Sequence, residues 1–167
     1  MNSMLNSIKK MTKPLADRAA LSIARAILRV IDDKLPIQSV QVDLLSGETR
    51  DRVERIQEYG FTSVPLPGCR GISLFIGGDR SHGAVIATDD DRYRKKGLES
   101  GEVAIYTDEG DFIHFKRGRI IQITAANGIV VEAPTVTVTS GDVIASGISL
   151  VHHVHPGCQG GSTGQPM

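Results

Sequence analysis

The first long apolar pattern in the chain repeats every four residues. Its apolar members are Leu15, Ala19, Ile23, Ile27 and Ile31, and the polar side chains between them include Arg18, Ser22, Arg25 and Arg29. This spacing is typical of an amphipathic helix, so we predict one over Lys13–Asp33, with Pro14 in its first turn and Pro36 beyond its end. The apolar face either packs on its own domain or docks a partner, because an alanine-rich face permits close approach.

Beyond Pro36 apolar and polar positions alternate with a period of two, which predicts strands. The predicted strands are Ser39–Leu45, Arg50–Gln57, Gly71–Ile76, Gly83–Thr88 and Glu102–Thr107. Five short strands favour a small barrel of the OB type, which we place over residues 35–107. Such barrels often bind oligonucleotides, but the basic cluster at residues 92–96 follows three aspartates and aromatic residues are few. We therefore expect no nucleic-acid partner.

After Asp111 the predicted strands become shorter, and glycines recur between them at close intervals. These strands are Phe112–Phe115, Ile120–Thr124, Ile129–Glu132, Thr135–Thr139, Val143–Ala145 and Ile148–Val151. In a single chain such short strands leave their edges and their apolar sides open. We therefore expect residues 108–151 to form an intertwined β-helix or β-prism from three copies of the chain, which closes those edges.

The net charge of zero hides an uneven distribution of charged residues. All 19 lysines and arginines and 17 of the 19 acidic residues lie in residues 1–119, and only Glu132 and Asp142 follow. A neutral chain is not typical of nucleic-acid binders. An end with so few charges is expected to bury itself against copies of itself or to meet an apolar surface. Two cysteines without a C-x-x-C spacing indicate assembly in a reducing compartment.

Two histidines near the C-terminus are the main candidates for chemistry. On an extended strand, His153 and His155 point to the same side because they are two residues apart. One chain supplies half a metal site, whereas three chains would bring six imidazoles to an axis, an arrangement that suits iron, nickel or cobalt better than zinc. The alternative is a pair of surface histidines that bind no metal.

Asp142 is a second candidate ligand, since it lies between apolar segments. If it faced a three-fold axis, three carboxylates would need a cation between them, and oxygen ligands favour calcium. The alternative is an ordinary solvated carboxylate in a turn. The sequence contains none of the common signatures of catalytic nucleophiles, metalloproteases or phosphate-binding loops.

Several ordered blocks of the sequence resemble one known family. They are residues 52–63, with the letters RVERIQEYGFTS, then Pro65–Gly68, Gly77–Gly83, Asp90–Arg94 and Gly101–Tyr106. Together they resemble the central spike, or baseplate assembly protein V, of Mu-type contractile-tailed bacteriophages. The final His-x-His is also similar to that of the related P2-type tail spikes. The likeness extends over roughly residues 14–155.

The resemblance implies a homotrimer with no enzymatic activity, located at the baseplate tip of the virion tail and assembled in the host cytoplasm. It implies a docking segment over residues 1–34 that meets a baseplate hub protein, for which we predict Leu15, Ile23, Ile27 and Ile31. An OB-fold domain over residues 35–107 and a triple-stranded β-helix over residues 108–151 would follow. Residues 152–167 would hold one iron ion per trimer through His153 and His155, and their glycine-rich tail would either fold back or remain loose.

The family's spike pierces the host outer membrane when the tail sheath contracts, and we expect the same of this chain. Two alternatives come from other classes of protein. A cupin-like metalloenzyme also carries a His-x-His pair, but it normally needs a further Glu and His, and neither follows His155. An OB-type module that binds a nucleic acid or a glycan would need an aromatic face that is missing here.

Overall fold

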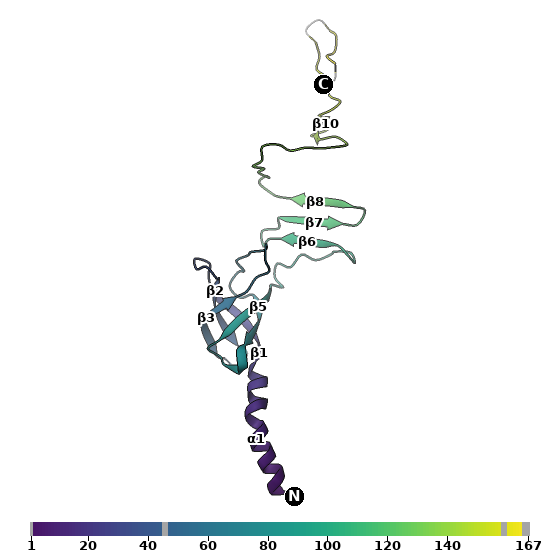
Figure 1. Cartoon of the computed structure of the whole chain (residues 1–167). Coiled ribbons are helices and arrows are strands. Elements are labelled where there is room, and N and C mark those ends of the chain that lie inside the picture. Colours follow the sequence, from purple (N-terminus) through teal and green to yellow (C-terminus); the bar gives the residue numbers. More distant parts are fainter. Residues whose placement is uncertain (1, 45–46, 158–159, 165–167) are drawn as a thin grey trace. The chain divides into compact units, whose positions relative to one another are not determined.

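A helix opens the described part of the chain, and strands joined by turns follow it (Figure 1). The computed structural model describes residues 2–44, 47–157 and 160–164. It divides into two compact units, Met1–Ala126 and Asn127–Met167. The first unit contains α1 (Asn2–Leu21), β1 (Ile23–Asp32), β2 (Ser39–Leu44), β3 (Thr49–Arg55), β4 (Arg70–Phe75), η1 (Ile76–Gly78), β5 (Gly83–Asp89), β6 (Val103–Tyr106), β7 (Phe112–Lys116) and β8 (Ile120–Thr124).

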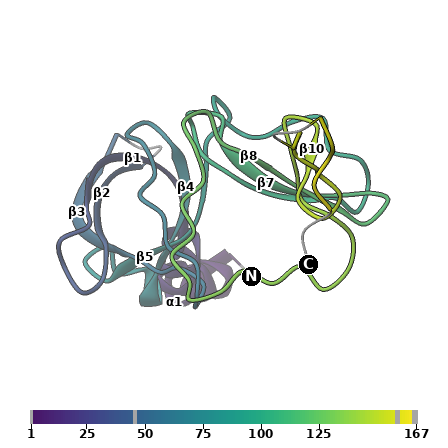
Figure 2. The ribbon, with the colours of Figure 1, turned by 90° about the horizontal axis from the view of Figure 1, so that it is seen from above.

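The first five strands close into a barrel in the order β1-β2-β3-β5-β4, which confirms the predicted five-stranded barrel (Figure 2). In strand β2 one face points into the barrel, because Val40, Val42 and Leu44 are buried at alternate positions. These side chains pack with Leu28, Phe75, Val85 and other apolar residues in one core. The predicted strands that became β2, β3, β4 and β5 are confirmed to within two residues at each end.

The predicted helix over Lys13–Asp33 is wrong in its bounds. Helix α1 ends at Leu21, and the second half of the predicted helix is strand β1. This strand, and not the predicted strand Glu102–Thr107, completes the five strands of the barrel. A spacing of four residues is also an even number, so it fits a strand as well as a helix. Ala26 and Leu28 face the core, whereas Ile23 and Ile27 face outward and are exposed. The barrel therefore begins well before residue 35.

Ile31 reaches the core by a local irregularity of β1. The pairing of β1 with β2 shifts by one residue between Leu28 and Val30. Such a bulge exchanges the two faces of a strand, so Ile31 packs against the core while Val30 is exposed. Ile23, Ile27 and Ile31 are thus residues of the barrel wall and not of a docking helix.

The predicted strand Glu102–Thr107 does not belong to the barrel. Its observed counterpart β6 pairs with β7, and β7 pairs with β8, in a separate antiparallel sheet. In this register Val103, Phe115 and Ile121 lie side by side, as do Ile105, Ile113 and Ile123. One face of the sheet is therefore apolar throughout.

The second unit contains one short hairpin, formed by β9 (Ile144–Ala145) and β10 (Ile148–Ser149). Its two-residue turn has positive φ angles at Ser146 and Gly147, 51° and 83°, as the tightest hairpins require. The predicted strands Ile129–Glu132 and Thr135–Thr139 form no β-pairing in the single chain as the structure describes it. No helix in the described residues is long and apolar enough to cross a membrane.

Candidate functional site

The apolar face of the β6-β7-β8 sheet is largely open in the single chain. Its six side chains are between 37% and 61% exposed: Val103, Ile105, Ile113, Phe115, Ile121 and Ile123. Cross-strand neighbours of this kind stabilise a sheet when a second layer covers them. The chain itself leaves a continuous apolar surface uncovered, which is typical of an interaction surface.

Glu102 fastens the segment after the barrel to this sheet. Its Oε2 accepts hydrogen bonds from His114 Nε2 at 2.9 Å and from the backbone N–H of Glu99 at 3.0 Å, and its Oε1 accepts one from the backbone N–H of Arg117 at 2.9 Å. These contacts, first that with Arg117, lower the pKa of Glu102 to about 2. An ionised, buried carboxylate therefore holds the start of the sheet in place.

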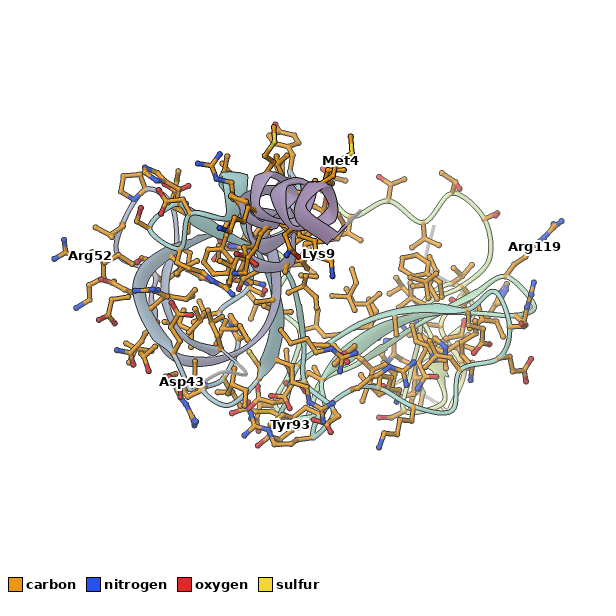
Figure 3. The ribbon with its side chains drawn as sticks, turned by 90° about the horizontal axis from the view of Figure 1, so that it is seen from below. Met4, Lys9, Asp43, Arg52, Tyr93 and Arg119 are labelled. Atoms are coloured by element: carbon orange, nitrogen blue, oxygen red, sulfur yellow. The ribbon has the colours of Figure 1, made fainter. Side chains whose placement is uncertain are left out.

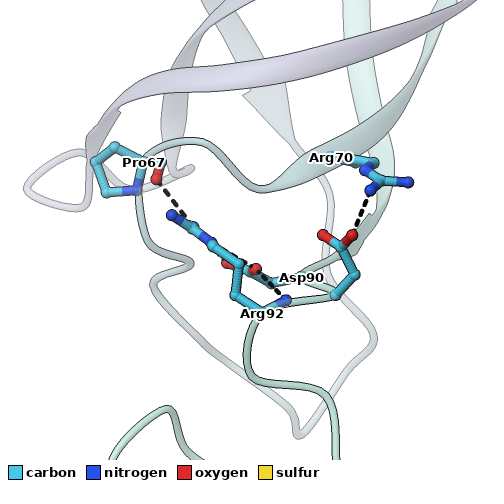
Figure 4. Close-up of polar contacts among 5 residues, drawn as sticks. Pro67, Arg70, Asp90 and Arg92 are labelled. Carbon is cyan, nitrogen blue, oxygen red and sulfur yellow. Dashed lines mark hydrogen bonds and ion pairs between the residues drawn. The ribbon is translucent and has the colours of Figure 1, made fainter.

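Two contacts join the segment that follows β5 to earlier parts of the first unit, an ion pair from Arg70 to Asp91 and a hydrogen bond from Arg92 to Pro67 (Figure 4). Arg92 donates to Asp90 through Nε at 2.8 Å and through Nη2 at 2.6 Å, and it also donates to the carbonyl of Pro67 at 3.0 Å. Arg70 of β4 pairs with Asp91. These contacts engage Asp90, Asp91 and Arg92 of the charged run at residues 89–96 in the fold of the chain itself.

Asp142 lies at the open end of the β9-β10 hairpin. Its Oδ1 accepts hydrogen bonds from the backbone N–H of Val143 at 2.8 Å and of Val151 at 3.2 Å. A hydrogen bond from Ser149, then these two backbone donors, lower the pKa of Asp142 despite partial desolvation. The carboxylate is ionised near neutral pH and ties together the two ends of the hairpin.

The imidazoles of His153 and His155 lie next to each other, with ring centres 5.1 Å apart and ring planes at 87°. Nδ1 of His153 lies 2.8 Å from the carbonyl oxygen of Ser149 and 3.1 Å from that of Leu150. Because a carbonyl only accepts, Nδ1 is the donor in this contact, and in a neutral imidazole the lone pair that binds metals is then on Nε2. A second hydrogen bond of this kind is what orients histidine ligands in metal sites.

The tail after His155 folds back on it. The carbonyl of His155 accepts a hydrogen bond from the backbone N–H of Thr163 at 2.9 Å. The backbone N–H of His155 donates to Thr163 Oγ1 at 2.8 Å. Pro156 and Ser162 form a bridge beside them. Both backbone groups of His155 are therefore held by the tail. Cys158 lies outside the described residues.

The residues predicted to act together are brought together only in part. His153 and His155 are adjacent, but in the ranges that the structure describes no three His, Cys, Asp or Glu side chains of one chain gather around a common point. Leu15 lies on α1 and is 70% exposed, away from the barrel isoleucines with which it was grouped. Met4, Ile8 and Met11 on the same helix were not predicted, although their spacing of four and three residues was the available signal.

The sequence of the chain is similar to those of known phage and prophage proteins. The family model described as Bacteriophage Mu Gp45, N-terminal, matches residues 25–92, from β1 to just beyond β5. The baseplate puncturing device gp45 of Escherichia phage Mu is 35% identical over 191 aligned positions, which cover 97% of this chain and 96% of that protein. The Mu-like prophage FluMu protein gp45 of Haemophilus influenzae is 37% identical over 106 positions, 64% of this chain and 58% of that protein. The chain therefore belongs to the bacteriophage Mu Gp45 family.

Proposed function

We propose that the chain is the central spike of a contractile phage tail, a structural protein of the baseplate that pierces the host outer membrane when the sheath contracts. The single observation that carries this function is its 35% identity, along 97% of its length, to a protein named a baseplate puncturing device. The chain is not an enzyme. Neither a cupin-like metalloenzyme nor an OB-type ligand-binding module is favoured by its family.

We propose a homotrimer as the working form, attached to a baseplate hub protein. The apolar face of the β6-β7-β8 sheet supports this, because a single copy leaves it open to water. Residues 129–138 support it too, since Ile129, Val130, Val131, Val136 and Val138 are all more than half exposed. Three intertwined copies would pair the open strand edges and bury these side chains in a shared β-helix.

The proposed apex is held by one iron ion per trimer, bound by His153 and His155 of three chains. The residues present fit such a site, because the Nδ1 contact of His153 leaves Nε2 free to bind and the two rings of each chain are adjacent. The ion would crosslink the three chains at the end where fraying begins.

Asp142 is a candidate for a second ion, calcium, if three copies meet at an axis. One oxygen of each carboxylate is already engaged by backbone N–H groups. Calcium takes six to eight oxygen ligands, so water would have to complete such a site. The elemental analysis that tests for iron would therefore also measure calcium in the same sample.

The charge distribution supports piercing as a mechanical act. A tip with few charged side chains enters an apolar layer at low desolvation cost, and the residues after Arg119 carry only Glu132 and Asp142. The charged first part would remain at the baseplate, where it contacts water and its partners.

The test combines light scattering with elemental analysis of the purified full chain. We expect a mass of three chains per particle and about one iron for every three chains, with any calcium measured in the same sample. The double variant His153→Ala/His155→Ala should lose the iron, whereas His152→Ala, a neighbouring exposed histidine, should keep it. A monomeric particle would contradict the spike assembly, and iron that is unchanged in the double variant would contradict the apex site.

A further inference from the structure

Helix α1 has almost no support from its own chain. Among the residues that the structure describes, the main contacts of the helix with the rest of the first unit are at its C-terminal end, where the backbone of Arg18 lies against Gly78 and the carbonyl of Ser22, just after the helix, accepts the N–H of Phe75 at 2.7 Å. Every side chain of the helix that is described is exposed. Most helices in proteins are stabilised by packing of an apolar face, and Pro14 removes one internal hydrogen bond of α1. The helix therefore needs a partner.

The apolar side chains of α1 form a narrow seam. Met4, Ile8, Met11 and Leu15 are separated by four, three and four residues, and their exposed fractions are 73%, 50%, 77% and 70%. This alternation of three and four is the repeat of a coiled coil, with Ile8 and Leu15 at a positions and Met4 and Met11 at d positions.

The charged residues of α1 stay away from this seam until the helix nears the barrel. Lys9, Lys10, Lys13 and Asp17 fall at the outer b, c and f positions of the repeat. Figure 3, which looks along the helix, shows Met4 and Lys9 projecting from different sides of it. The flanking e and g positions from residue 12 onward are uncharged, as Thr12, Pro14, Ala19 and Leu21. Arg18, at the next d position, ends the seam.

We propose that α1 packs in parallel and in register against the same helix of the other two copies, through Met4, Ile8, Met11 and Leu15. This inference rests on the trimer proposed above. A second copy fits better than an acidic partner, because an acidic surface would be drawn to Lys9 and Lys10 on the outer side. Uncharged flanks allow three helices to approach without repulsion between like charges.

The seam is too short to assemble the chains alone. It covers fewer than two heptads, whereas independent coiled coils need several. When the chains are already joined through the sheet and the β-helix, the helices meet at a high effective concentration, and a short seam then suffices. The three-helix bundle would be the base of the trimer, and Lys9, Lys10 and Lys13 would form its outer surface.

Crosslinking of single cysteines tests this arrangement in the full chain. In a Cys69→Ala/Cys158→Ser background, Met11→Cys and Leu15→Cys are treated with a short bis-maleimide and resolved under denaturing conditions. Lys13→Cys, at an outer f position of the same helix, is the matched control. We expect at least tenfold more covalent dimer and trimer from the two seam variants than from the control. Leu15→Cys also tests direction, because in an antiparallel bundle Leu15 of one chain would lie near Met4 of another.

Light scattering on the same samples tests the trimeric spike separately from the helix bundle. A trimeric particle in which the seam variants crosslink no better than Lys13→Cys would overturn the helix bundle and leave the proposed spike intact, with another protein as the occupant of the seam. A trimer in which only Met11→Cys crosslinks would overturn the parallel arrangement. A monomeric particle would contradict the spike assembly itself, and the helix bundle with it.

Discussion

Glu102 is the carboxylate that joins the three-stranded sheet to the segment leaving the barrel. It receives two backbone N–H groups and the ring of His114, and both side chains of this acid–histidine pair are at most 9% exposed. Arg55 has a comparable place at one end of the barrel, where it is 8% exposed and donates to Gln38, to Ser63 and to Thr88. These side chains connect segments that are far apart in the sequence.

The pH dependence of stability should reveal the role of Glu102. Its pKa is about 2 in the folded protein and ordinarily 4.5, so the unfolded chain binds the proton more readily. The carboxylate therefore stabilises the fold fully above about pH 4.5, and this contribution disappears as the pH falls toward 2. We expect Glu102→Gln to lower the thermal midpoint at neutral pH and to flatten its decline between pH 5 and pH 2.

Thermal unfolding followed by circular dichroism over that pH range provides the measurement. Glu109→Gln, in the exposed turn between β6 and β7, is the control and should behave as the original chain does. Parallel pH profiles for Glu102→Gln and the original chain would contradict the proposed role.

At the level of elements, the sequence was enough to predict the number of barrel strands and the positions of four of them. This is because the alternation of apolar and polar residues along a strand is a local property. Strand β1 was not predicted, since its isoleucines are four apart and satisfy both periods. Its β-branched residues Ile23, Ile27, Val30 and Ile31 were the available signal for a strand. The bulge between Leu28 and Val30 could not be predicted from the sequence, because it depends on the pairing of β1 with β2.

Gly83 of β5 pairs with Phe75 of β4 and leaves no room for a larger residue beside the aromatic ring. A Cβ added at Gly83 would lie 2.6 Å from Cε1 and 2.9 Å from Cδ1 of Phe75, a fully buried core residue. We expect Gly83→Ala to lower the free energy of unfolding by about 1–3 kcal/mol, because the ring must leave its packed position. Chemical denaturation measures this change, with Gly164→Ala, whose added Cβ meets nothing, as the control. An unchanged denaturation midpoint would show that Phe75 moves freely.

In the molecule as a whole, only part of the chain buries its large apolar side chains. The barrel buries its core within one chain, whereas the sheet face and residues 129–138 leave large aliphatic side chains open. The sequence indicated this division through its charges, since charged residues become rare after Arg119. The adjacency of His153 and His155 was also predictable, because it follows from their spacing. The contacts of Thr163 with His155 were not, because they arise from a reversal of the tail.

Placing a charge on the open sheet face should prevent assembly. Ile113 lies in the middle strand β7, between Ile105 and Ile123. In a trimer that buries this face, Ile113→Asp would bury one unpaired carboxylate per chain, so we expect at least a tenfold loss of trimer in light scattering. Arg119→Asp introduces the same residue in the exposed turn before β8 and should leave the mass unchanged. A trimer that forms equally well with Ile113→Asp would show that the face is not an interface.

The reversal of the tail at His155 also decides how the protein can be extended. Because Thr163 holds both backbone groups of His155, a domain joined directly after Thr163 would begin beside His155 and could disturb these two hydrogen bonds. An added domain should instead be inserted at an exposed turn, such as the one at Glu109. Such an insertion leaves the histidine pair and the hydrogen bonds between Thr163 and His155 undisturbed.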